Sequence, residues 1–142
     1  MFVALVQQPI DVDDLLQRVR TDACGAVALF LGVVREQHDG RSVRGLSYEA
    51  YPAMAVEQMQ QIAGEAVERW GPCEIAIVHR TGDLAIGEAS VAVAVGAPHR
   101  GEAFDACEYA IDELKRRVEI WKKEHYIEGD AVWVDNRAAT HG

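Results

Sequence analysis

Two long apolar runs restrict the fold of this chain more than any other feature. Residues 25–34 read GAVALFLGVV and residues 89–98 read ASVAVAVGAP, and neither run contains a charged side chain. β-Branched residues favour strands, and an uninterrupted apolar run is typical of a strand with both faces buried. We therefore predict a strand buried on both faces at 25–34 and a further strand at 89–98.

Shorter segments complete the set of expected strands. The polar turn EQHDGR follows the first apolar run, so the segment after that turn is its expected hairpin partner. Two glycines, Gly82 and Gly87, indicate a loop before the second apolar run. The expected shorter strands are 2–6, 42–51, 73–80 and 131–134.

Three helices are expected between these strands. Asp11 is a good N-cap for a helix that ends near Arg20, and Pro52 suits the first position of a second helix that Gly71-Pro72 ends. The third helix begins near Arg100. Its apolar residues recur at helical spacing and predict a buried stripe of Phe104, Cys107, Ile111, Leu114 and Val118.

The resulting order is roughly β-α-β-β-α-β-β-α-β, which indicates an α+β fold in two layers rather than a doubly wound sheet. A chain of 142 residues is the size of one domain, and we expect a single domain over 1–142. The sequence contains neither GxGxxG nor GxxxxGK[ST], so a nucleotide-binding loop of either type is not expected.

The charge balance limits the kind of partner that the chain can bind. There are 14 Lys and Arg against 23 Asp and Glu, so the formal net charge is -9. A protein that binds the phosphate backbone of nucleic acids usually has a basic domain, so this class is disfavoured. A local cationic cleft for a small anion remains compatible with an acidic protein.

Cysteine use and the N-terminus bear on where the protein is found. Cys24, Cys73 and Cys107 are scattered, without a CxxC pair, which indicates reduced thiols in a cytoplasmic protein. The N-terminus lacks a basic region and has only a short apolar run, so we expect neither a signal peptide nor a membrane span.

The segment LKRRVEIWKKE, residues 114–124, concentrates positive charge around Trp121. If the helix continued through it, Lys115 and Lys122 would lie two turns apart, about 10 Å along one face. Lys115 flanks the predicted apolar stripe, so its ammonium is expected to be partly desolvated, which favours a role in proton transfer. Trp121 would supply an apolar wall.

Three further basic residues follow directly after predicted strands, where functional side chains often gather. Arg35 follows the first apolar run, and His99 and Arg100 follow the second, at the start of a helix whose free N–H groups favour an anion. The alternatives remain open, because lysines on a helix are more often solvated than catalytic and His79, within a strand, is more often structural. The residues alone predict an anion-binding cleft without a metal site, and leave its function undetermined.

The chain resembles the catalytic large subunit of molybdopterin synthase. The resemblance runs from about Gly25 to Val134 and is carried by the segments GAVALFLGVVRE, LSYEAYPAMA, ERWG, IVHRTGDLAIGEASVAVAVGAPHRGEAFDACEYAIDELKRRVEIWKKE and WV, in the family's order and spacing. Two positions depart from the family pattern: His38 comes one place later in its loop, and Glu119 stands where many relatives have a proline.

The resemblance implies an α/β hammerhead fold with an added small β subdomain. It also implies an enzyme, a sulfurtransferase that converts cyclic pyranopterin monophosphate (precursor Z) into molybdopterin by adding two sulfurs. The sulfur comes from the C-terminal Gly-Gly thiocarboxylate of a small ubiquitin-like subunit, and two large subunits form a homodimer within a heterotetramer. No cofactor is implied.

The resemblance also implies roles for individual residues. Lys115 is expected nearest the partner's terminal acyl carbon, and Lys122 is expected to hold the substrate and assist opening of the cyclic phosphate. The other residues expected to contact the substrate are Val33, Val34, Arg35, His99, Arg100, Lys123, Glu124 and Arg137.

Two other functions are compatible with the same basic residues. One is a non-catalytic α+β module that binds an anionic metabolite, and the other is a nucleic-acid adaptor that uses residues 114–124 as a basic helix. The net charge disfavours the adaptor, whose affinity would fall steeply with salt.

Overall fold

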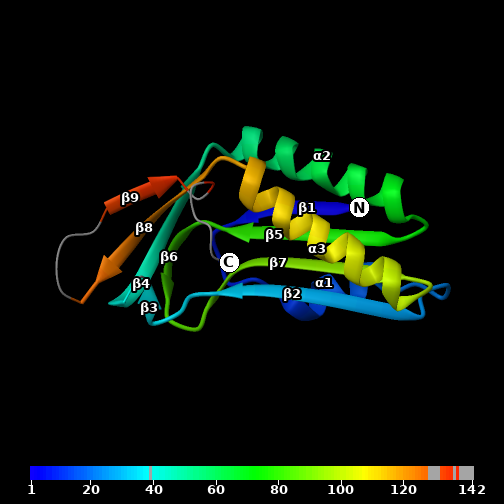
Figure 1. Ribbon diagram of the computed structural model, residues 1–142, viewed down its shortest axis with the longest axis horizontal. Coiled ribbons are helices and arrows are strands. Elements are labelled where there is room, and N and C mark those ends of the chain that lie inside the picture. Colours follow the sequence, from blue (N-terminus) through cyan, green and yellow to red (C-terminus); the bar gives the residue numbers. More distant parts are fainter. Residues whose placement is uncertain (39, 128–131, 136, 138–142) are drawn as a thin grey trace.

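The computed structural model describes residues 1–38, 40–127, 132–135 and 137 (Figure 1). The elements follow in the order β1 (Phe2–Val6), α1 (Val12–Val19), β2 (Ala26–Val33), β3 (Gln37–His38), β4 (Arg41–Ala50), α2 (Pro52–Trp70), β5 (Glu74–Arg80), β6 (Gly82–Ala85), β7 (Ala89–Ala97), α3 (Arg100–Arg117), β8 (Ile120–Tyr126) and β9 (Val132–Asp135).

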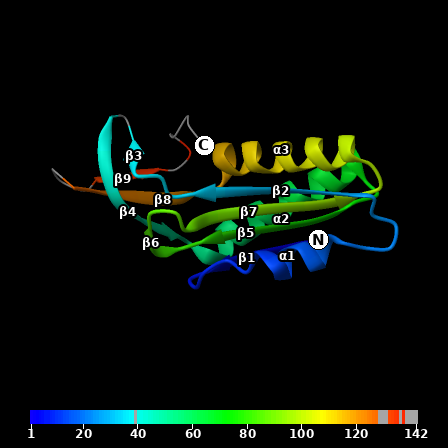
Figure 2. The same cartoon turned by 90° about the horizontal axis from the view of Figure 1, so that it is seen from below.

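The first sheet has the strand order β1-β5-β7-β2. Only the β1–β5 pair is parallel within this sheet, and the other two pairs are antiparallel. Helices α2 and α3 cover one face and α1 lies on the other, as the turned view in Figure 2 shows. The main core lies between the sheet and α2 and α3, and a smaller apolar cluster lies under α1.

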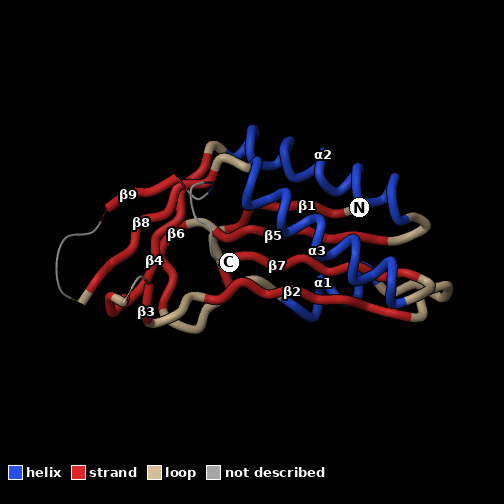
Figure 3. Tube along the Cα trace, in the orientation of Figure 1, coloured by secondary structure: helices blue, strands red, loops and turns tan. Residues whose placement is uncertain are grey.

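The second sheet lies at one end of the first (Figure 3). It has the order β3-β4-β8-β9, and β6 also pairs with β4. The predicted α+β fold with an added β subdomain is therefore confirmed. No helix in the described part of the chain is long and apolar enough to cross a membrane.

The helices begin and end for the reasons that the sequence suggests. The side chain of Asp11 accepts a hydrogen bond from the backbone N–H of Asp14 at 3.1 Å, so Asp11 is the N-cap of α1 as predicted. Pro52 stands in the first turn of α2, and the helix ends at Gly71. A side chain at Gly71 would place its Cβ 2.4 Å from the Val67 carbonyl oxygen, so only glycine fits there.

The prediction that residues 25–34 are buried on both faces is wrong. Strand β2 is at the edge of the first sheet, and alternate apolar side chains on it are 37% to 54% exposed. They share a face with Ala92 and Ala94, which pack against α1. Helix α1 lies mainly over β5 and β7 and contacts the edge strand less, so these β2 side chains stay partly exposed. The exposed side chains are Val27, Leu29, Leu31 and Val33.

Two details of the third helix differ from the prediction. The helix ends at Arg117, so Val118, which is predicted on its apolar stripe, is extended instead. The condition that the helix continues through residues 114–124 is not met, because Ile120 pairs with Ala50 of β4. The β-branched and aromatic residues of this segment satisfy their backbone groups in a sheet. Phe104 is 64% exposed, because the buried face of α3 consists mainly of small residues that allow close packing on the sheet.

Three strands were not expected. β3 falls within the predicted turn 36–41, β6 falls within the predicted loop after residue 80, and β8 occupies a segment for which no strand is predicted. The last strand occupies Val132–Asp135, and residue 131, with which it was expected to begin, lies outside the described residues.

Candidate functional site

Lys115 and Lys122 come together where the two sheets meet, although they lie on different elements. Lys115 is in the last turn of α3, and Lys122 is on β8, which begins shortly after the helix ends. Side chains alternate along a strand, so Ile120, Lys122 and Glu124 share the buried face of β8. Lys122 is 8% exposed and pairs across the ladder with Tyr48.

Burial and neighbouring charges act together on Lys115. Its side chain is partly buried, and this desolvation lowers the pKa of its ammonium from the ordinary value of 10.5. The positive charges of Lys122 and Arg35 lower that pKa further. Three cations from separate parts of the chain are therefore close enough to influence one another, which is the arrangement that an anion would neutralise.

A buried carboxylate partly balances this charge. Glu124 is 3% exposed, its Oε1 lies 3.7 Å from Lys122 Nζ, and its Oε2 accepts a hydrogen bond from the Tyr126 hydroxyl at 2.8 Å. Burial, with a smaller contribution from the Glu124 charge, raises the pKa of Tyr48, while a hydrogen bond with Ser90 opposes this shift.

Beneath the lysines lies His79, which is 1% exposed. Its Nδ1 donates to the Arg80 carbonyl oxygen at 2.8 Å, and its ring meets that of Tyr48 edge-on with centroids 5.1 Å apart. Burial lowers the pKa of His79 to about 4, opposed by the bond to Arg80 and assisted by the charge of Lys115. The ring is therefore neutral at pH 7.

The end of β2 sets the position of Arg35. The ladder with β7 shifts register between Gly32 and Val33. Side chains still alternate here, so Val33 is exposed like Leu31, while Val34 is 3% exposed. Arg35 follows with an exposed side chain, which interacts with other residues of the protein.

His99 and Arg100 do not join this cluster within one chain. They lie at the start of α3, whereas Lys115 is in its last turn. Arg100 and Lys115 are 15 positions apart on the helix, a distance of about 22 Å along the axis. The expectation that one cleft collects all these residues is therefore wrong for a single chain, because the helix that connects them also keeps them apart.

Lys123 and Arg137 also lie away from the buried lysine. Lys123 alternates with Lys122 and points to the other face of β8, where its Nζ lies 5.5 Å from the Trp133 ring centroid. Arg137 donates to both carboxylate oxygens of Asp135 and lies 3.4 Å from Glu119. Its charge is thus already paired.

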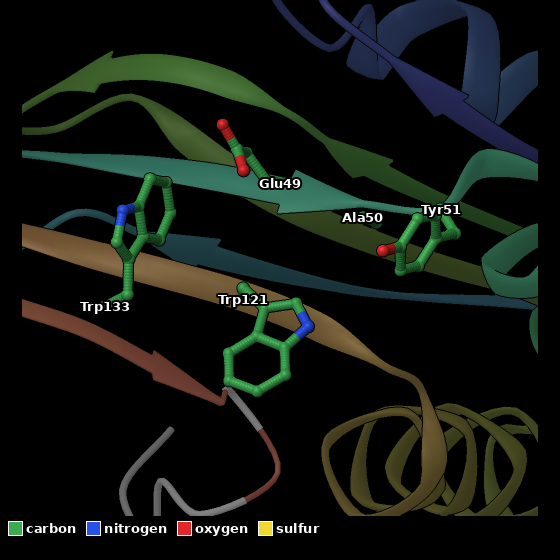
Figure 4. A pocket seen from close by; sticks show the side chains of 5 residues that line it. All are labelled: Glu49, Ala50, Tyr51, Trp121 and Trp133. Atoms are coloured by element: carbon green, nitrogen blue, oxygen red, sulfur yellow. The ribbon is translucent and has the colours of Figure 1, made fainter.

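Trp121 does not form a wall of the lysine site. It points to the face of β8 opposite Lys122, into a shallow cleft of about 350 Å³ on the outer face of the second sheet (Figure 4). The cleft is lined by Glu49, Ala50, Tyr51, Trp121 and Trp133.

Sequence reasoning missed the residues that form the floor of the site. Neither Tyr48 nor Tyr126 belongs to a chemical motif in the sequence, and the position of His79 within an apolar strand predicts only a structural role. Tyr48 lies within the LSYEAYPAMA segment that carries the family resemblance, which is the one signal that pointed to it. Among the described residues, no group of three or more His, Cys, Asp or Glu side chains is placed to hold a metal ion.

Known proteins resemble the chain over most of its length. A family model described as MoaE protein matches residues 5–117. A molybdopterin synthase catalytic subunit from Emericella nidulans is 46% identical over 122 residues, which are 86% of this chain and only 63% of that protein. The protein of the same name from Culex quinquefasciatus is 43% identical, over 98% of this chain and 90% of its own length.

A solved structure extends this similarity to three dimensions. The crystal structure of molybdopterin synthase from Staphylococcus aureus matches with a TM-score of 0.89 and 40% identity, and the match covers 92% of this chain and 95% of that one. Sequence and structure agree, and the chain therefore belongs to the MoaE family, in which these relatives are molybdopterin synthase catalytic subunits.

Proposed function

We propose that this protein is the catalytic subunit of a molybdopterin synthase. It converts precursor Z into molybdopterin with sulfur from the C-terminal thiocarboxylate of a small ubiquitin-like subunit. The observation that carries the proposal is that Lys115, Lys122 and Arg35, from three separate segments, act on one another where the two sheets meet, in a chain whose relatives are named for this activity.

The chemistry of the substrates fits this cluster. A cyclic phosphate and a thiocarboxylate are both anions, and each relieves the mutual repulsion of the three cations when it binds. Charge-assisted hydrogen bonds of this kind contribute about 1.5–3 kcal/mol each. The sulfur nucleophile belongs to the partner, so the chain needs no reactive cysteine of its own.

Lys115 acts on the acyl group of the partner. The thiocarboxylate sulfur attacks a carbon of the substrate and displaces an oxygen substituent from that carbon, which forms a thioester. Water then cleaves the acyl–sulfur bond and leaves a thiolate on the substrate. The sulfur stays on the substrate and the partner leaves with a carboxylate. Lys115 stabilises the oxyanion that forms at the acyl carbon, or transfers a proton there, and its lowered pKa favours that second role.

Lys122 holds the substrate phosphate and assists opening of the cyclic ester. Glu124 fixes the lysine, since the two groups are buried together at 3.7 Å. Arg35 belongs to the same site, and the two preceding residues support it, with Val34 buried in the core and Val33 exposed on the opposite face. Lys123 lies over the Trp133 ring and Arg137 is paired with Asp135, so these two cations add to the positive charge around the anion site without binding the anion directly.

The second basic cluster, His99 and Arg100, reaches the site from another copy of the chain. Ala26 at the start of β2 pairs with Ala97, close to His99, whereas Arg35 follows the other end of β2. A two-fold axis that lays the exposed apolar faces of two β2 edge strands together brings the start of one strand beside the end of the other. His99 and Arg100 of each copy then approach Arg35 and Lys115 of its mate, so we propose a homodimer within a heterotetramer.

We also propose a cytoplasmic location. Cys24, Cys73 and Cys107 are all free thiols, as expected in a reducing compartment. Burial raises the pKa of Cys107 to about 11, which keeps this thiol protonated and unreactive.

A reconstituted reaction tests the proposal. The purified protein is mixed with the thiocarboxylated small subunit and precursor Z, and the fluorescent oxidation product of molybdopterin is measured, with Lys115→Ala beside the wild type. Product from the wild type and little from the variant is the expected result. No product, where an established large subunit gives product, would instead favour a module that binds an anionic metabolite without catalysis.

A further inference from the structure

The turn between β6 and β7 holds the residue that precedes Arg35. The backbone N–H of Val34 donates to the Glu88 carbonyl oxygen at 3.0 Å, and the N–H of Gly87 donates to the Val34 carbonyl oxygen at 2.7 Å. Both backbone groups of Val34 are therefore bonded to this turn. Gly87 has a φ of 86°, a left-handed conformation that favours glycine.

The side chain of Glu88 locks that turn in place. Its Oε1 accepts from the Ala85 backbone N–H at 2.8 Å, and its Oε2 accepts from Arg80 Nη1 at 2.8 Å. Arg80 is itself anchored, since its side chain is largely buried and its Nε donates to the Gln7 carbonyl oxygen at 3.2 Å. One carboxylate thus ties the turn to the ends of β1 and β5.

These contacts form a continuous connection to the cationic cluster. β2 loses its regular register at Val33, so the sheet ladder no longer dictates where the chain runs beyond that point. The bonds from the 85–88 turn to Val34 take over this task. Arg35 is the next residue, and its charge acts on Lys115.

We propose that Glu88 is a positioning residue for the anion site: by locking the 85–88 turn onto Arg80, it holds Val34 and so keeps Arg35 where its charge acts on Lys115. Glu88 does not touch the substrate in this arrangement. The assignment of Arg35 to an anion site rests on the proposed function, but the placement of Arg35 by Glu88 can be tested without turnover.

The test detects a displacement of Arg35 by the change that it causes in the pKa of Lys115. The chain has three lysines, Lys115, Lys122 and Lys123, so protein labelled with ¹³C-lysine gives few signals, and Lys115 is assigned by its loss in Lys115→Arg. The charged or titratable groups that act on Lys115 are Lys122 from β8, Arg35 after β2 and His79 from β5. The pKa of Lys115 is measured by NMR titration in wild type, Glu88→Ala, Arg35→Ala and the double variant.

The direction of the change separates repositioning from simple loss of charge. Loss of the negative charge of Glu88 by itself lowers the pKa of Lys115, whereas displacement of Arg35 raises it. We expect a rise in Glu88→Ala, of the same sign as in Arg35→Ala, and no further rise in the double variant. A smaller rise is expected in Glu88→Gln, which still accepts from Ala85 and serves if the alanine variant folds poorly.

A matched control removes a carboxylate elsewhere. Glu74 stands at the opposite end of β5 and pairs with the N-terminal ammonium at 3.2 Å, so Glu74→Gln should leave the pKa of Lys115 unchanged. The proposal would be overturned if the pKa of Lys115 were unchanged or lowered in both Glu88 variants. It would also be overturned if Glu88→Ala changed the pKa of Lys115 equally in the wild-type and Arg35→Ala backgrounds.

The kinetic readout is separate. In the reconstituted reaction, Glu88→Ala should raise KM for precursor Z about tenfold and change kcat less, because Arg35 binds the substrate before the chemical step. A fall in kcat at unchanged KM would contradict positioning through Arg35. If the wild type gives no turnover, the proposed function fails while the titration still decides the role of Glu88.

Discussion

The ammonium of Lys122 and the carboxylate of Glu124 lie 3.7 Å apart on the same face of β8, and both side chains are almost completely buried. Their side chains point to the same face because the two residues are two positions apart on a strand. Each charge is stable in this position chiefly because the other is present, and the Tyr126 hydroxyl completes the hydrogen bonding of the carboxylate.

Removal of this carboxylate should be costly. Glu124→Gln leaves a buried ammonium without its counter-charge, so the free energy of unfolding at pH 7 should fall by about 3 kcal/mol. Urea denaturation measures the loss. The matched control is Asp14→Asn, which breaks the exposed pair with Arg18 and should cost less than about 1 kcal/mol. Equal losses in the two variants would show that Glu124 is not a buried partner of Lys122.

Lys115 should be required for activity yet unfavourable for stability. Lys115→Met should reduce turnover by about 100-fold or more, because a methionine cannot stabilise an oxyanion or transfer a proton. The folded state disfavours the charged lysine, so wild-type stability should increase as the pH rises through its lowered pKa toward 10.5.

The methionine variant removes that penalty. It should therefore be more stable than the wild type at pH 7 and should lack the gain at high pH, which denaturant titrations at several pH values detect. Arg116→Met, at an exposed position of the same helix, is the control and should change neither property appreciably. A less stable methionine variant at pH 7 would argue against desolvation of Lys115.

The buried His79 should make the fold sensitive to acid. Its pKa is about 4 in the folded protein and 6.5 when exposed, so the unfolded chain binds a proton first as the pH falls. Stability that is fully present above pH 6.5 should decline between pH 6.5 and 4, by about 3 kcal/mol at most. His79→Gln should lack this component in urea denaturation curves, whereas His125→Gln, at a less buried position, should retain it.

Subunit mixing should reveal whether the site is shared between two copies. His99→Ala and Lys115→Ala should each be inactive, and exchange of their subunits should restore about a quarter of wild-type activity, since half of the dimers then carry one intact site of two. Leu29→Glu, which places a charge on the exposed face of β2, should give a monomer in analytical ultracentrifugation. Failure of the mixture to recover activity, although subunits exchange, would place all the essential residues within one chain.

Cys107 should be dispensable. It is buried on α3 with its thiol toward the Val93 carbonyl oxygen at 3.6 Å, and burial raises its pKa to about 11. Cys107→Ala should therefore keep activity within about twofold and cost about 1 kcal/mol of stability. Loss of all turnover in a folded variant would indicate that the chain itself carries the transferred sulfur.

Local sequence signals predicted the parts of the fold that depend on neighbouring residues. Asp11 and Pro52 begin helices where expected, and Gly71 ends one, because capping and backbone restrictions act within a few residues. The apolar runs at 25–34 and 89–98 also form strands as predicted, because the β-branched residues in them favour extended backbone whatever packs against them. Lys115 was expected to be partly desolvated from its place beside the apolar stripe, and it is.

The sequence by itself determined the α+β class, the family and the basic residues from which the site is built. Only the tertiary structure decided which of those residues meet. The sequence pattern shows that 25–34 is apolar, but it does not show whether a second layer covers that strand. Nor does it show that the helix ends before Val118 and that a strand begins at Ile120. Pairing of β8 with β4 brings Lys122 next to Lys115, and the length of α3 keeps His99 away, because contacts between distant segments depend on packing that no local pattern records.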